Sequence, residues 1–178
     1  MGMESYYVNL VPFGVKMVKG DETYKFVGRS NKEINEIVML LKEGGYLLAK
    51  QDDFMYEIDS TLSIRFSCEE SFVKTMMIQG CFTWFEEGTK LIYSLSNYIN
   101  REIMRIYINF AFGEDFDISN ETDFCKKITE GYKEKFEEFT RVYGAKKIKQ
   151  TVGEFYTNRD KVDGNMSKIK KLLGIVPK

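Results

Sequence analysis

Few side chains in this chain have the chemistry for nucleophilic or metal-dependent catalysis. It contains three cysteines, Cys68, Cys81 and Cys125, and no histidine. A cysteine nucleophile needs a neighbouring base or a basic environment to form its thiolate, and histidine is the usual partner. Histidine is also the commonest metal ligand. We therefore expect the cysteines to be structural, and we predict no catalytic residue, no metal site and no cofactor.

An acidic segment has part of a calcium-binding pattern. Asp115, Asp117 and Ser119 match the first three ligand positions of such a loop. The pattern then fails, because Asn120 stands where the loop needs glycine and Lys126 where it needs a bidentate glutamate. We expect these acids instead to complement the positive end of a helix that begins at about residue 120.

Two pairs of carboxylates could be candidates for acid–base catalysis of the glycosidase type. They are the adjacent residues Glu69 and Glu70, and Glu86 and Glu87. Such catalysis needs two carboxyl groups that face each other across a cleft, and adjacent residues do not point to one place. We interpret these residues as solvated surface, apart from Glu86, to which we assign a helix-capping role.

Tyrosines and arginines on polar faces remain as candidates for binding another protein. In the helix that we expect at 84–100, Tyr93 projects away from the apolar stripe. In the strand that we expect at 104–112, Tyr107 shares a polar face with Arg105. Tyrosine and arginine contribute much of the binding energy in protein interfaces. The predicted binding residues are Tyr93, Tyr107, Arg65 and Arg105, unless a second layer of structure covers the tyrosines.

One stretch, 74–100, organises the elements that must position these residues. Its first half alternates apolar and polar residues, which predicts a strand at about 73–82, although a single helix from residue 70 onward is the alternative. Its second half has helical spacing and predicts a helix at about 84–100, with Thr83 and Glu86 as a capping box. Gly88 inside this helix indicates close packing against the sheet, because glycine costs about 1 kcal/mol there.

The rest of the chain predicts mostly strands. Strands are expected at 6–13, 15–18, 23–27, 46–49, 54–58, 62–66 and 104–112, with the second and third forming a hairpin. Helices are expected at 31–43, opened by a capping box from Ser30 to Glu33, and at 120–143. Beyond these we expect an edge strand at 148–155, a turn at 163–165 and a short helix at 166–173.

Length and charge limit the number of domains and the classes of function that the chain can have. A chain of 178 residues is typical of one domain, and its net charge of −1 excludes a globally basic nucleic-acid binder. Residues 145–178 carry eight lysines and one arginine against three acids, a net +6 that leaves −7 for the rest. This basic segment could contact nucleic acid or an acidic protein, or dock on the acidic body. Its lysines outnumber its single arginine, which disfavours nucleic-acid readout.

These patterns predict an α+β fold, with a mostly antiparallel sheet of about six to eight strands and two or three amphipathic helices on one face. We expect a single core domain at 1–144 and a basic C-terminal extension at 145–178 packed on it. The predicted function is a non-enzymatic protein-binding module of the inhibitor, immunity or adaptor type. The alternative is a small-molecule-binding or carboxylate-based enzymatic domain with a cleft near Arg65. We expect a cytoplasmic protein whose partner is another protein, without a membrane segment and without nucleic acid.

Overall fold

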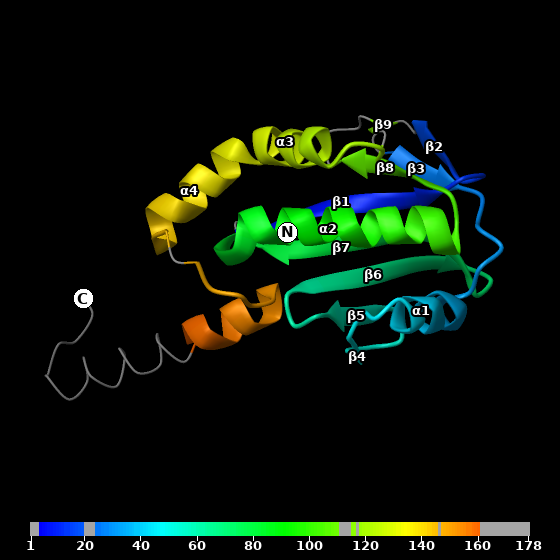
Figure 1. Cartoon of the computed structure of the whole chain (residues 1–178), viewed down its shortest axis with the longest axis horizontal. Helices are drawn as coiled ribbons and strands as arrows, with labels where there is room; N and C mark the ends of the chain where they lie inside the picture. The colour runs from blue at the N-terminus through cyan, green and yellow to red at the C-terminus, as the bar shows by residue number, and fades with distance from the viewer. Residues whose placement is uncertain (1–3, 20–23, 111–114, 117, 146, 161–178) are drawn as a thin grey trace, which may run out of the picture.

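A seven-stranded antiparallel sheet forms the centre of the molecule, in the order β4-β5-β6-β7-β1-β8-β9 (Figure 1). The computed structural model describes residues 4–19, 24–110, 115–116, 118–145 and 147–160. The strands are β1 (Ser5–Pro12), β4 (Leu48–Lys50), β5 (Met55–Ile58), β6 (Leu62–Glu69), β7 (Phe72–Cys81), β8 (Ile106–Phe110) and β9 (Asp115–Phe116). A separate hairpin pairs β2 (Lys16–Lys19) with β3 (Tyr24–Val27).

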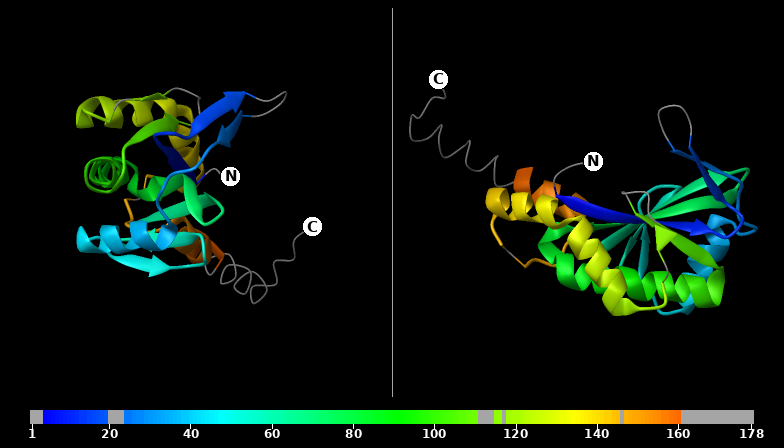
Figure 2. Two further views of the ribbon diagram at one scale, coloured as in Figure 1. Left: turned by 90° about the vertical axis from the view of Figure 1, so that its right-hand side faces the viewer. Right: turned by 90° about the horizontal axis from the view of Figure 1, so that it is seen from above.

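Three of the described helices lie along one face of this sheet, and two more lie at one end of it (Figure 1). They are α1 (Ile34–Glu43), α2 (Phe85–Tyr98), α3 (Glu121–Gly131), α4 (Lys133–Tyr143) and a further helix at 152–160. A 3₁₀ turn, η1 (Phe82–Trp84), precedes α2, and a π-helical segment, η2 (Ile99–Ile103), follows it. Seen edge-on, α1, α2 and α3 lie side by side along the sheet, and the β2–β3 hairpin projects from the other side (Figure 2). The predicted α+β class is confirmed.

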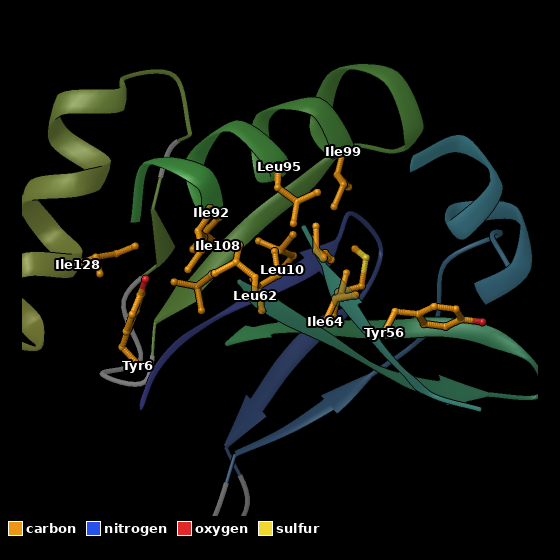
Figure 3. Packing of buried hydrophobic residues seen from close by; sticks show 14 of the residues in the cluster. Tyr6, Leu10, Tyr56, Leu62, Ile64, Ile92, Leu95, Ile99, Ile108 and Ile128 are labelled. Carbon is orange, nitrogen blue, oxygen red and sulfur yellow. The ribbon is translucent and has the colours of Figure 1, made fainter. Parts of the chain in front are cut away.

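Helix α2 crosses over strand β1. Both β7 and β8 pair antiparallel with β1, so they run parallel to each other with β1 between them. A parallel connection needs a crossover, and a helix is its usual form. Ile92 and Leu95 of α2 and Ile99, the first residue of η2, are fully buried and point onto the apolar side chains of the sheet (Figure 3). The predicted change from strand to helix within 74–100 is therefore confirmed.

Two glycines let α2 approach the sheet at Tyr6 of β1. Tyr6 is fully buried and lies opposite Gly80 of β7 in the register of the two strands. A Cβ atom added at Gly80 would overlap the Tyr6 ring, and one added at Gly88 of α2 would overlap the Tyr6 hydroxyl oxygen. The hydroxyl donates to the carbonyl of Phe85 at 3.4 Å. The close packing that we expected at Gly88 is confirmed.

The junction of α3 and α4 covers the part of β1 that β8 leaves unpaired. Strand β8 pairs with Val8–Pro12 only, which leaves the edge of Ser5 to Tyr7 open on that side. The Tyr132 hydroxyl accepts from the Tyr7 amide at 3.1 Å and donates to the Tyr7 carbonyl at 2.8 Å, and Lys135 donates to the Ser5 carbonyl. Side chains thus replace the missing strand, because buried backbone groups need partners. The single helix expected at 120–143 is correspondingly two helices that meet at Tyr132.

Two predicted capping boxes do not form. Trp84 precedes α2 without a side-chain cap, while the Thr83 hydroxyl contacts the Cys81 sulfur at 3.2 Å and the Glu86 carboxylate pairs with Lys147. At α1, the Ser30 hydroxyl bonds to the Lys32 backbone, and Glu33 caps the helix through no side-chain bond. The 32–33 backbone pairs instead with 72–73, so α1 begins three residues later than expected.

The prediction for the C-terminal segment was also wrong, here because a capping box forms where we expected none. The segment expected as an edge strand at 148–155 becomes the helix at 152–160. The Glu154 amide donates to the Thr151 hydroxyl, and the Thr151 amide donates to the Glu154 carboxylate, which is a complete capping box. The turn at 163–165 and the helix at 166–173 lie outside the described residues.

Where the structure describes it, the end of the acidic segment forms the N-terminus of α3, as we expected. Asn120 accepts from the Asp123 amide and caps α3, and Glu121 lies in the first turn. Asp115 belongs to β9, and Asp117 lies outside the described residues.

The Tyr6 contact predicts a specific pattern of rescue. Alanine at Gly88 should lower the free energy of unfolding by about 1–3 kcal/mol through overpacking. Tyr6→Phe removes the hydroxyl that the new methyl group meets, so Gly88→Ala combined with Tyr6→Phe should cost less than the sum of the single changes. Alanine at Gly80 meets two ring carbons of Tyr6 as well as the hydroxyl oxygen, and phenylalanine retains the ring carbons, so Tyr6→Phe should rescue Gly80→Ala only in part.

Urea unfolding of this double-mutant cycle measures the effect. Gly153→Ala serves as the control, because the nearest atom to its added Cβ is 3.8 Å away and alanine favours a helix. Additive losses at Gly88 and Tyr6 would contradict the proposed contact.

Candidate protein-binding surface

The outer face of the sheet, opposite α1, α2 and α3, carries polar side chains. Strand register places Ser63 and Tyr7 beside Gln79, and Arg65 and Asn9 beside Met77. Residues directly opposite each other in antiparallel strands share a face, so these side chains form one continuous polar surface. The alternation of polar and apolar residues along β1, β6 and β7 produces it.

The β2–β3 hairpin covers one end of this outer face. The Asn109 amide donates to the Met17 sulfur at 3.4 Å, which leaves Asn109 buried. The Tyr107 hydroxyl donates to the Val15 carbonyl at 2.9 Å. Met17 pairs with Phe26 across the hairpin, so this pair faces the sheet. The hairpin is therefore fixed to β8 by contacts from two outer-face side chains.

The outward side of the hairpin combines apolar and basic residues. Its register pairs Lys16 with Val27 and Val18 with Lys25. Val18 and Val27 are 48% and 56% exposed. Their side chains thus lie on the face turned away from the sheet.

An exposed aromatic ring lies beside the start of the hairpin. Phe13 is 62% exposed, with the Arg105 guanidinium 5.3 Å from its ring centroid and the Tyr107 ring edge-on at 6.4 Å. The Phe13 amide donates to the Arg105 carbonyl at 2.9 Å. We refer to Phe13, Arg105 and Tyr107 as the Phe13 patch.

A tight turn holds Phe13 at this exposed position. The Val15 amide donates to the Pro12 carbonyl, and Gly14 has a φ of +98°. These are features of a β-turn that needs glycine at its third position, which places Phe13 at the second, corner position. The sequence signal for this was Pro12-Phe13-Gly14, which we interpreted only as the end of a strand and did not include among the site residues.

The structure brings two of the four predicted binding residues together. Tyr107 and Arg105 both belong to the Phe13 patch. Arg65 shares the outer face but lies on β6, three strands from β8, which is about 14 Å at ordinary strand spacing. It is exposed, 3.8 Å from Asp52 and 3.2 Å from the Met55 sulfur.

Tyr93, the fourth residue, belongs to the helical layer. Its ring packs edge-on against Phe124 of α3, with centroids 5.4 Å apart, and it is half-buried. Helix α3 thus provides the second layer that we considered as the alternative. Tyr93 is not part of the outer face.

The three cysteines have the properties of structural residues. All are unpaired, and burial raises the pKa of Cys68, Cys81 and Cys125 above the ordinary value. Near neutral pH these groups are therefore thiols and not the thiolates that a nucleophile requires.

The described residues contain neither a cluster of metal ligands nor a helix suited to cross a membrane. Within the described ranges, no three or more cysteine, aspartate and glutamate side chains converge to hold a metal ion. No helix among those residues combines the length and apolar character that crossing a membrane requires. Comparison with known proteins found no matching family model, no matching curated protein and no matching solved structure.

The state of the thiols can be tested by alkylation. With iodoacetamide at pH 7.5, we expect Cys81, which is 1% exposed, to react no faster than the protein opens. The half-exposed Cys68 and Cys125 should react earlier, at rates below those of a free thiol because their pKa is raised. Mass spectrometry of tryptic peptides measures each rate. Rapid labelling of Cys81 in the folded protein would contradict the structural role and indicate an activated nucleophile.

Proposed function

We propose that this protein is a protein-binding module whose contact surface is the Phe13 patch with the outward side of the β2–β3 hairpin. Small inhibitors, immunity-type proteins and adaptors act in this way. Three unpaired cysteines support a reducing compartment such as the cytoplasm. The proposal needs no catalytic group.

The exposed ring of Phe13 is the observation that supports this proposal most. Much of its apolar surface faces solvent, while the turn and the Arg105 carbonyl hold its backbone. An aromatic side chain fixed before binding loses little conformational entropy when a partner covers it. Arginine and tyrosine beside it are the residue types enriched in interface hot spots.

The neighbouring hairpin supports a contact larger than one side chain. Val18 and Val27 add apolar surface, while Lys16 and Lys25 between them keep the free surface hydrated. Apolar contacts surrounded by polar groups are typical of interfaces between proteins that also exist separately.

A second candidate function is a carboxylate-based site on the outer face near Arg65. Burial, together with the charge of Glu154, raises the pKa of Glu57, which lies beside Ser63 in the β5–β6 register. Carboxylates with a raised pKa cluster at catalytic sites. This candidate takes second place because Arg65 is exposed and has the surface carboxylate of Asp52 as its charged neighbour.

Photo-crosslinking in the native host tests the proposed surface. A photoreactive phenylalanine analogue at position 13 should give a discrete covalent adduct with one protein. The same analogue at position 47 is the control, because Leu47 is 75% exposed next to β4, at the other end of the sheet from β8. Adducts of equal yield from both positions, or none from position 13, would contradict the proposal.

Affinity measurements then identify the contributing residues. With the crosslinked partner purified, Phe13→Ala and Arg105→Ala should each raise Kd about 10-fold or more, which corresponds to about 1.4 kcal/mol. Leu47→Ala should change it less than about twofold, since exposed residues outside an interface contribute little. Calorimetric titration gives these constants, and circular dichroism confirms that the variants are folded.

A further inference from the structure

The first and last described segments meet at a buried carboxylate. Glu4, at the start of β1, is 5% exposed. It accepts hydrogen bonds from the Tyr156 hydroxyl at 2.6 Å and the Tyr143 hydroxyl at 3.3 Å, and it lies 3.6 Å from the Arg159 guanidinium. Tyr143 ends α4, whereas Tyr156 and Arg159 belong to the helix at 152–160. We refer to these four residues as the Glu4 clamp.

The clamp holds Glu4 in its charged form. Burial alone would raise the pKa of Glu4, but the bonds from Tyr156 and Tyr143 and the charge of Arg159 together bring it below the ordinary value. The bond to Glu4, with burial, raises the pKa of Tyr156 to about 12. Two further groups interact electrostatically with Glu4, namely Lys135 of α4 and the Cys81 thiol of β7.

Apart from the clamp, the helix at 152–160 is attached mainly by the apolar packing of Val152, Phe155 and Tyr156 against the core. Phe155 packs against Phe139 and Tyr143, with ring centroids 5.8 and 5.2 Å apart. The Gln150 amide donates to the Thr83 hydroxyl at 3.3 Å. Lys147 pairs with Glu86, but both side chains are 68% exposed, so this pair adds little.

The interface between this helix and α4 is also incompletely packed. An open hollow of about 680 Å³ lies there, lined on one side by Phe139, Val142 and Tyr143 and on the other by Phe155 and Arg159. Val142 remains 53% exposed at its margin. Dispersion contacts are missing across the open part of this hollow, whereas Phe155 packs against Phe139 and Tyr143 beside it.

We propose that the helix at 152–160 is a detachable latch, held on the core by the Glu4 carboxylate and released when that carboxylate is neutralised or withdrawn. Release removes the cover that Phe155 gives to Phe139 and Tyr143. The described part of this helix has nine residues, too few to be stable alone in water, so this part unfolds locally on release. This latch is independent of the Phe13 patch, which lies at the opposite end of β1.

Hydrogen exchange of the full chain, followed by mass spectrometry, tests the latch. Glu4→Gln removes the charge with little change of shape, and Tyr156→Phe removes the shortest bond of the clamp. In both variants we expect amides of 152–160 to exchange about 10-fold faster or more, while amides of β7 keep their rate. Glu86→Gln is the matched control: it breaks the exposed pair with Lys147 in the segment that leads to the helix, and it should leave both rates unchanged.

Two results would overturn the latch. One is an unchanged exchange rate in 152–160 for both variants. The other is an equal acceleration in 152–160 and in β7, which would make the helix part of a single cooperative unit. Two variants on opposite sides of the clamp keep the test decisive if Glu4→Gln fails to fold.

The clamp also predicts a pH dependence. Because the folded pKa of Glu4 lies below its unfolded value of about 4.5, its charge stabilises the docked helix above that pH. This contribution is lost as the pH falls through the lowered pKa. The difference in free energy of unfolding between the wild type and Glu4→Gln should therefore shrink from pH 6 to pH 3, as measured by urea unfolding. A difference that stays constant over this range would show that the Glu4 charge does not hold the helix.

Discussion

The fold depends on the distance of closest approach between α2 and the sheet at Tyr6. One buried ring occupies the space that side chains at Gly80 and Gly88 would need. Gly80 lies beside Tyr6 in the adjacent strand, and Gly88 lies above it in the crossover helix, so this contact joins β1, β7 and α2. Because α2 leads directly to β8, its seating also sets where β8 arrives beside β1. A larger residue at either glycine would move the helix and, with it, the pairing of the last long strand.

Strand β1 is an interior strand of the sheet, and each of its sides makes a different set of contacts. Its helix-facing residues complete the core, and its outer residues extend the polar face toward the hairpin. Its N-terminal edge, which β8 does not reach, is closed by the Tyr132 hydroxyl and the Lys135 ammonium group. Its two ends lead to the two candidate functional features. Pro12 opens the turn that presents Phe13, and Glu4 anchors the last described helix. Binding and latching can therefore share one rigid strand without sharing residues.

The sequence patterns predicted the elements well where burial alone decides them. Alternation in β8 and the change of period at Trp84 reflect which side chains face the core, and both are present. Capping was harder to predict. A capping motif is a local pattern, but its residues can instead form hydrogen bonds with segments that are distant in the sequence. The residues around Ser30 and Thr83 bond to β7, Cys81 and Gln150, whereas Thr151 and Glu154 meet no such competition and cap their helix. The alternation in the strand expected at 104–112 placed Arg105 on the same face as Tyr107, and in the structure both side chains lie beside Phe13. The corner position of Phe13 has a local signal in Pro12-Phe13-Gly14, but the cover over Tyr93 depends on the distant segment of α3, which no local pattern records.

The placement of β1 also has a consequence for the order of folding. Strand β1 lies inside the sheet, and both of its neighbours come much later in the chain: Tyr6 pairs with Gly80, and Val8 pairs with Phe110. Closing such long loops costs entropy before any contact repays it, and folds rich in distant pairings form slowly. During synthesis, β4 to β7 can assemble as a local meander while β1 waits. The pairing of β1 is complete only when β8 has emerged. The Glu4 clamp at the N-terminal end of β1 can form only after Tyr156 has been synthesised. Until β7 and β8 have emerged, the apolar residues of β1 therefore lack their neighbours in the sheet.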